Sequence, residues 1–144
     1  MIRIYFYINK YMVKKMPLTH LLKVVPYYLG GFKVITTEAI EKGRIIYKLR
    51  GQIVEERTRT SIQSGTIHVE DDVGEFITHS CYPSVKVSHF PSYLYACRNI
   101  EKYEDITINY NINEDEIAYP FDCDECGMRI DTNSMCEKKY LEYY

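Results

Sequence analysis

The sequence contains no tryptophan, no long apolar run and almost no net charge. Of its 144 residues, 18 are Lys or Arg and 20 are Asp or Glu, so the formal net charge is -2. Such a small net charge gives no overall attraction to nucleic acid or to an anionic membrane. A membrane-spanning helix needs about 20 consecutive apolar residues, and no segment reaches that length. We therefore expect neither a direct nucleic acid partner nor a membrane partner.

The sequence also lacks a convincing secretory signal. Residues 1–16 are apolar and aromatic, but polar residues interrupt them and no small-residue cleavage site follows. Five cysteines are an odd number, which favours reduced thiols in structural or metal-binding roles over disulfides. The expected location is intracellular, cytoplasmic or nuclear, and not secreted.

Short β-forming segments separated by turns dominate the chain. Strands are predicted within residues 21–49 and at 66–69, 85–88, 93–96 and 106–110, with residues 57–65 irregular and with a further strand at 2–8 if that segment is folded. No amphipathic helix of three or more turns is evident before the C-terminal tail. The fold class is therefore mainly β. We expect an N-terminal extension outside the core at residues 1–20, a domain at 21–119 and a cysteine-containing tail at 120–144.

His79 and Cys81 are two residues apart and would share one face of a strand. An imidazole beside a thiol suggests a cysteine nucleophile. No strand-to-helix elbow or oxyanion loop follows, however, and a cysteine beside a histidine is more commonly structural. We therefore disfavour a hydrolase.

Two segments, Phe76–Ser84 and Glu104–Tyr110, resemble the signature segments of SET domain lysine methyltransferases. The family's first segment contains Asn-His-Ser-Cys and, one residue later, Pro-Asn; here Thr78 and Ser84 replace the two asparagines. The family's second segment is Gly-Glu-Glu-Leu-Thr, one residue, Asp or Asn, and then Tyr; Glu104–Tyr110 matches it, with Tyr103 in the glycine position. Ala96–Ile100 resembles the strand and turn that lead into it, and the order of all three pieces agrees.

The family's opening segment, with its Gly-x-Gly, resembles residues 31–43. In a gapless register the second glycine falls on Lys33, so a long side chain stands where backbone should approach the cofactor closely. Gly30 and Gly31 are the alternative source of the turn. The resemblance covers roughly Gly30 to Cys136.

This resemblance implies a SET fold, a β-clip of several small sheets with a knot-like C-terminal segment. It also implies methylation of a protein lysine with S-adenosylmethionine as cofactor. Tyr110 is the expected catalytic residue, whose hydroxyl orients the amine and whose ionised form a nearby cation would favour. The structural alternative is a core tyrosine at the end of a strand.

The resemblance further implies which residues surround the cofactor and the substrate. Thr78 and His79 would hold the adenine, partly through backbone groups. The cofactor-binding residues implied are Gly31, Phe32, Lys33, Thr78, His79, Tyr110 and Phe121. Tyr95 and Ile108 are the expected substrate-channel residues, and the aliphatic Ile108 leaves the number of methyl groups added open.

The family commonly ends in a zinc cluster that joins three late cysteines to the one in the first signature. The corresponding set is Cys81, Cys123, Cys126 and Cys136, with Cys97 left as a buried strand residue. Four thiolates satisfy a closed structural zinc site. The tail departs from the family's Cys-x-Cys pattern, but a two-residue gap is itself common in zinc sites, and unliganded thiols are the alternative.

Acidic runs at residues 70–72, with Glu75, and at 114–116 flank the signatures and could attract a basic protein substrate. Solvated loops are the simpler explanation of either run alone. Two other functions stay open: a SET-like interaction module without activity, and methylation of a small-molecule amine. Measured affinity for S-adenosylmethionine distinguishes these functions, because an enzyme binds the cofactor and an inactive interaction module does not.

Overall fold

The structure, a computed structural model, describes residues 20–132. Cys136, most of the predicted N-terminal extension and the strand predicted at 2–8 lie outside the described residues. Strands within the described part are β1 (Leu22–Pro26), β2 (Phe32–Thr36), β3 (Ile45–Lys48), β4 (Gln52–Val54), β5 (Ile62–Ser64), β6 (Ile67–Glu70), β7 (Thr78–His79), β8 (Val85–Val87), β9 (Tyr93–Ala96), β10 (Thr107–Ile108), β11 (Phe121–Asp122) and β12 (Arg129–Ile130). A 3-10 helix η1 (Gly74–Phe76) and a single-turn helix α2 (Tyr110–Asn113) complete the elements.

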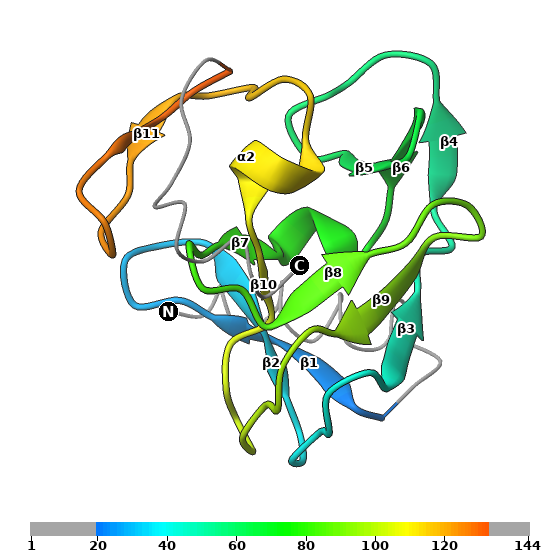
Figure 1. Cartoon of the computed structure of the whole chain (residues 1–144), viewed down its shortest axis with the longest axis vertical. Helices are drawn as coiled ribbons and strands as arrows, with labels where there is room; N and C mark the ends of the chain where they lie inside the picture. The colour runs from blue at the N-terminus through cyan, green and yellow to red at the C-terminus, as the bar shows by residue number, and fades with distance from the viewer. Residues whose placement is uncertain (1–19, 133–144) are drawn as a thin grey trace, which may run out of the picture.

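The strands form small separate sheets, which confirms the mainly β fold class (Figure 1). Three sheets are pairs, β1-β2, β7-β10 and β11-β12, and two have three strands, in the orders β3-β9-β8 and β4-β6-β5. β7 and β10 lie near the middle of the molecule, while β11 lies at one side (Figure 1). No helix among residues 20–132 is long and apolar enough to cross a membrane.

The turn between β1 and β2 forms where the sequence has two adjacent glycines. Gly30 and Gly31 have φ values of 106° and 73°, a region that glycine enters without a steric cost. The Tyr27 amide donates to the Gly31 carbonyl at 3.0 Å and closes the turn. β2 then directs Val34 and Thr36, both fully buried, into the core.

Two of the predicted element assignments need correction. Residues 62–64 form β5 although the segment was expected to be irregular, because all three are buried and pair with β6. The strand predicted at 106–110 contains only Thr107 and Ile108. It ends there because Asn109 caps α2, accepting a hydrogen bond from the Asn111 amide at 3.0 Å.

A buried carboxylate organises the loops around β3 and η1. Asp71, only 4% exposed, accepts hydrogen bonds from the Tyr47 hydroxyl and from the amides of Arg50, Val73 and Gly74. Glu70 of the same run accepts from the hydroxyl of Thr60 at 2.8 Å. The 70–72 run is therefore partly structural, which leaves fewer of its carboxylates to contact a basic partner.

Candidate functional site

The parallel pair β7-β10 brings the two signature segments together. Thr78 pairs with Thr107, and His79 pairs with Ile108. The Ser80 amide continues the pairing by donating to the Ile108 carbonyl at 3.0 Å. Residues that are distant in the sequence thus become neighbours at the centre of the fold.

Tyr110 begins α2 directly after this pair and is held at both its backbone and its hydroxyl. Its amide donates to His79 Nδ1 at 3.1 Å, and its hydroxyl donates to the Ile77 carbonyl at 2.7 Å. Burial, with a smaller effect of the Glu114 carboxylate, raises the pKa of the Tyr110 phenol above its usual value. Burial therefore acts against the ionised form expected from the sequence, and the hydroxyl is a neutral donor to the Ile77 carbonyl.

A cleft, here named the Lys33 cleft, lies on one side of Tyr110. Its lining residues are Tyr27, Lys33, Thr78, His79, Asp105, Thr107, Tyr110, Phe121, Asp122, Cys123, Asp124 and Glu125. Five of the seven expected cofactor residues are in this set. Gly31 and Phe32 are not among these lining residues, and the Phe32 ring instead packs edge-on against Phe76 at 5.5 Å between centroids.

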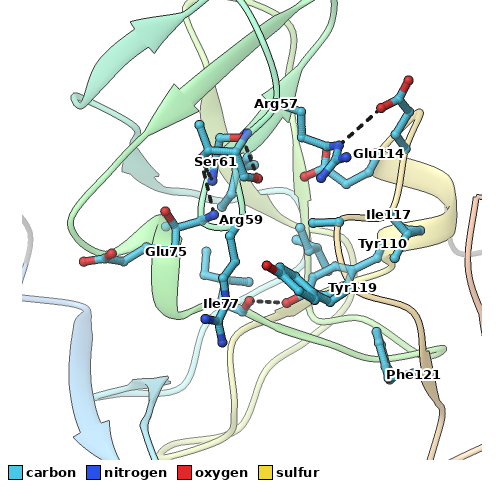
Figure 2. Close-up of a pocket in the computed structure, with 17 residues that line it drawn as sticks. Arg57, Arg59, Ser61, Glu75, Ile77, Tyr110, Glu114, Ile117, Tyr119 and Phe121 are labelled. Carbon is cyan, nitrogen blue, oxygen red and sulfur yellow. Dashed lines mark hydrogen bonds and ion pairs between the residues drawn. The ribbon is translucent and has the colours of Figure 1, made fainter.

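A second hollow, the Tyr119 pocket, contains Tyr110 and Phe121 as well. It is lined by Arg57, Thr58, Arg59, Thr60, Ser61, Ile62, Gly74, Glu75, Ile77, Ile108, Tyr110, Glu114, Glu116, Ile117, Ala118, Tyr119 and Phe121. Figure 2 shows the Tyr110 hydroxyl directed at the Ile77 carbonyl among these side chains. The Arg59 guanidinium lies 5.1 Å from the centroid of the Tyr119 ring. Tyr110 and Phe121 therefore form a common wall of the two hollows.

The two expected channel residues lie in different places. Ile108 is 1% exposed and lines the Tyr119 pocket beside Tyr110. Tyr95 lies on β9, opposite Ile45 and Lys86, and belongs to neither set of lining residues. The structure thus groups Ile108, but not Tyr95, with the expected catalytic residue.

Burial also changes the titration of two groups near Tyr110. The pKa of Glu114 is raised to about 7, mainly by burial and against the hydrogen bonds that its carboxylate accepts from the Gln63 amide. The pKa of His79 is lowered to about 4 by burial. Glu114 was expected only as part of an acidic run, and its role as a buried pocket residue could not be read from that run.

Three of the four expected zinc ligands converge. The Sγ atom of Cys81 lies 3.2 Å from that of Cys123 and 3.4 Å from that of Cys126. Zinc-sulfur bonds of about 2.3 Å place tetrahedral sulfurs roughly 3.8 Å apart, so the three thiols fit a zinc ion after a small expansion. Cys97 is buried elsewhere and donates to the Pro83 carbonyl.

The loop of the β11-β12 hairpin supplies Cys123 and Cys126. The Gly127 amide donates to the Cys123 carbonyl at 2.7 Å, and the Cys123 amide donates to the Met128 carbonyl at 2.9 Å. Gly127 has a φ of 72°, which a residue with a side chain adopts only with strain. This tight turn directs two thiols to the same place.

His79 and Glu125 contact the thiol cluster, and the cysteine spacing in the sequence indicates neither contact. His79 Nε2 lies 3.6 Å from Cys81 Sγ. Because His79 Nδ1 accepts the Tyr110 amide hydrogen, Nε2 carries the proton of the neutral ring and faces the sulfur as a donor, not as a ligand. The Glu125 carboxylate accepts from the Cys81 amide and the Ser80 hydroxyl, joining the hairpin to the first signature.

Comparison with known proteins identifies relatives of part of the chain. A curated protein of Mycosarcoma maydis, described as "Histone-lysine N-methyltransferase, H3 lysine-36 specific", is 41% identical over an alignment of 59 residues that covers 37% of this chain and 6% of that protein. The chain thus corresponds to a small part of that relative's length.

Solved structures with the same fold cover more of the chain. KRYPTONITE, in complex with mCHG DNA and SAH, has a TM-score of 0.61 and 20% identity over 81% of this chain and 30% of that chain. The methyltransferase domain of human SETMAR has a TM-score of 0.52 and 20% identity over 69% of this chain and 47% of that chain. At this identity the likeness establishes the fold. The family profile of the SET domain matches residues 31–111, more than half of the sequence, and the chain therefore belongs to the SET domain family.

Proposed function

We propose that this protein methylates a lysine amine of a protein substrate, with S-adenosylmethionine as the methyl donor. The observation that carries the proposal is that Tyr110 lines both the Lys33 cleft and the Tyr119 pocket. Methyl transfer is an in-line displacement, so donor and amine must approach one point from two sides. Two hollows that share one wall suit that requirement.

The Lys33 cleft is the proposed cofactor site. The rings of His79, Tyr110 and Phe121 pack against one another in this cleft. The ring centroids are 5.2 Å apart for His79 and Tyr110, 5.5 Å for His79 and Phe121, and 6.1 Å for Tyr110 and Phe121. Aromatic faces attract cations, and the cofactor carries a sulfonium cation. When bound, the cofactor supplies an electrophilic methyl group.

The Tyr119 pocket is the proposed lysine site. The aliphatic side chains of Ile77, Ile108 and Ile117 suit the methylene stem of a lysine. Because the Tyr110 hydroxyl hydrogen is directed at the Ile77 carbonyl, the phenol oxygen is left to accept a hydrogen bond from the amine. Desolvation in the pocket would lower the pKa of the lysine and favour its neutral, nucleophilic form.

A structural zinc ion is proposed for the thiol cluster. Cys81, Cys123 and Cys126 would hold it, with Cys136 as the proposed fourth ligand. Zinc would neutralise the thiolates and hold the β11-β12 hairpin against the first signature. This matters for the site because the hairpin carries Phe121 and Glu125, which line the Lys33 cleft.

The proposed substrate is a lysine-containing basic segment of an intracellular protein. The Mycosarcoma maydis relative is named for a histone lysine, and Glu75, which lines the Tyr119 pocket, provides an acidic group for a basic residue next to a target lysine. The Glu116 carboxylate of the same pocket pairs instead with Arg57 at 3.5 Å.

The test is incubation of the purified, metal-loaded full chain with labelled S-adenosylmethionine and a panel of basic proteins. Mass spectrometry should find methyl-lysine. No affinity for the cofactor by calorimetry would reject the enzyme and leave an interaction module. Transfer to small amines alone would reject the protein substrate.

A further inference from the structure

Lys33 occupies the position where the family pattern has a glycine, and its ammonium group lies in the Lys33 cleft. Its Nζ is 2.9 Å from an Asp105 carboxylate oxygen and 5.3 Å from the centroid of the Tyr27 ring. The Lys33 side chain is 24% exposed and that of Asp105 is 43% exposed. All three residues line the cleft, so the pair is both held in place and accessible from it.

The backbone explains why Lys33 and Asp105 meet and why a side chain is tolerated. Ile35 forms an isolated antiparallel bridge with Asp105, and the Ile106 amide donates to the Val34 carbonyl at 2.8 Å, so the two chain segments run side by side. Lys33 lies inside β2 and is not among the residues with positive φ. Its backbone conformation therefore does not require glycine.

The charges around the cleft are strongly unequal. Among the lining residues, Asp105, Asp122, Asp124 and Glu125 are acidic, whereas Lys33 is the only Lys or Arg. Such a surface suits a ligand with more positive than negative groups. S-adenosylmethionine is such a ligand, because its amino-acid end has a sulfonium, an ammonium and a single carboxylate.

We propose that Lys33 binds the α-carboxylate of S-adenosylmethionine and that Asp105 binds its α-ammonium group. This rests on the proposed function and deepens it by assigning one end of the cofactor. The Lys33 ammonium and the Asp105 carboxylate, 2.9 Å apart, are complementary to an α-amino acid zwitterion, because each protein group can face the ligand group of opposite charge. The ion pair can therefore exchange partners with the ligand without leaving either charge unpaired. The lysine in the glycine position thus becomes a ligand-binding residue.

The test compares S-adenosylmethionine with its decarboxylated analogue, which keeps the sulfonium and the amine. Calorimetry measures the affinity of the wild-type protein and of Lys33→Met for each of the two ligands. The four affinities form a double-mutant cycle that isolates the interaction between the Lys33 side chain and the ligand carboxylate. We expect Lys33→Met to weaken S-adenosylmethionine roughly tenfold to a hundredfold, the range for a lost hydrogen bond between charged groups. Affinity for the decarboxylated analogue should be unchanged, whereas Asp105→Asn should weaken both ligands.

Lys23→Met is the matched control, because Lys23 is an exposed lysine on the neighbouring strand β1. It should leave both affinities unchanged, and Lys33→Arg should retain most of the carboxylate preference. If Lys33→Met does not fold, the wild-type protein still supplies the test. It should bind the decarboxylated analogue more weakly than S-adenosylmethionine, by the same factor of roughly ten to a hundred. Equal wild-type affinities, or equal losses of both ligands in Lys33→Met, would overturn the assignment. A wild-type protein that binds neither ligand would instead reject the proposed function.

Discussion

Tyr110 is the residue at which the two hollows meet, and its hydroxyl is the group whose removal is most informative. Tyr110→Phe keeps the ring that packs near His79 and Phe121 but loses the oxygen that would orient the amine. We expect turnover to fall by about 10²- to 10³-fold, as for the loss of one positioned polar group, with cofactor affinity nearly intact. Single-turnover methylation and calorimetry check the two expectations.

Tyr95→Phe is the matched control, because Tyr95 lies outside both sets of lining residues. It should retain turnover. Full activity of Tyr110→Phe would remove Tyr110 from the catalytic role, and a loss in Tyr95→Phe would return Tyr95 to the channel.

Glu114 should make stability depend on pH in the direction opposite to ordinary acid denaturation. Its pKa of about 7 in the folded protein exceeds the usual 4.5, so the folded state favours the protonated carboxyl. The stabilisation is complete below the unfolded pKa and is lost as pH rises through the folded one. Relative to Glu114→Gln, the wild-type protein should lose stability between about pH 5 and about pH 8, measured as denaturant midpoints. Parallel profiles for the two proteins would contradict a buried, titrating Glu114.

At the scale of elements, Ser84 joins the loop after β7 to the chain around β10. Ser84 is fully buried. Its hydroxyl donates a hydrogen bond to the Asp105 carbonyl and accepts one from the Thr107 amide, each at 2.9 Å. The serine that replaces the family's asparagine thus has a structural role of its own. Ser84→Ala leaves the Thr107 amide without this partner and should cost about 1–3 kcal/mol of unfolding free energy. Thr66→Ala, at an exposed position, should be nearly neutral in the same urea titration.

The β11-β12 hairpin should be held by metal. Elemental analysis of the purified protein should find about one zinc per chain, as a closed four-ligand site requires. Cys126→Ser should lose the metal, whereas Cys97→Ser should keep it because Cys97 lies outside the thiol cluster. A metal-free wild-type protein would show that these thiols are unliganded.

At the scale of the whole molecule, the larger of two buried clusters among the described residues packs around β2 and β10, and the smaller one, of Cys81, Cys123 and Ile130, packs around the β11-β12 hairpin. Ile106 is fully buried in the larger cluster, immediately before β10. Ile106→Ala should cost about 2–5 kcal/mol of unfolding free energy through lost burial and an unfilled cavity. Ile53→Ala, at a position 54% exposed on β4, is the control and should cost far less. Equal losses in chemical denaturation would contradict this description of the core.

The mainly β class and the SET resemblance follow from the sequence, because strand alternation, turn glycines and motif spacing are local properties of the chain. Which side chains share a hollow depends instead on how distant segments pack together. Tyr95 and Ile108 were equally plausible channel residues, and packing placed only Ile108 beside Tyr110. The pairing of Lys33 with Asp105 likewise depends on the long-range bridge between Ile35 of β2 and Asp105, a contact that no local pattern encodes.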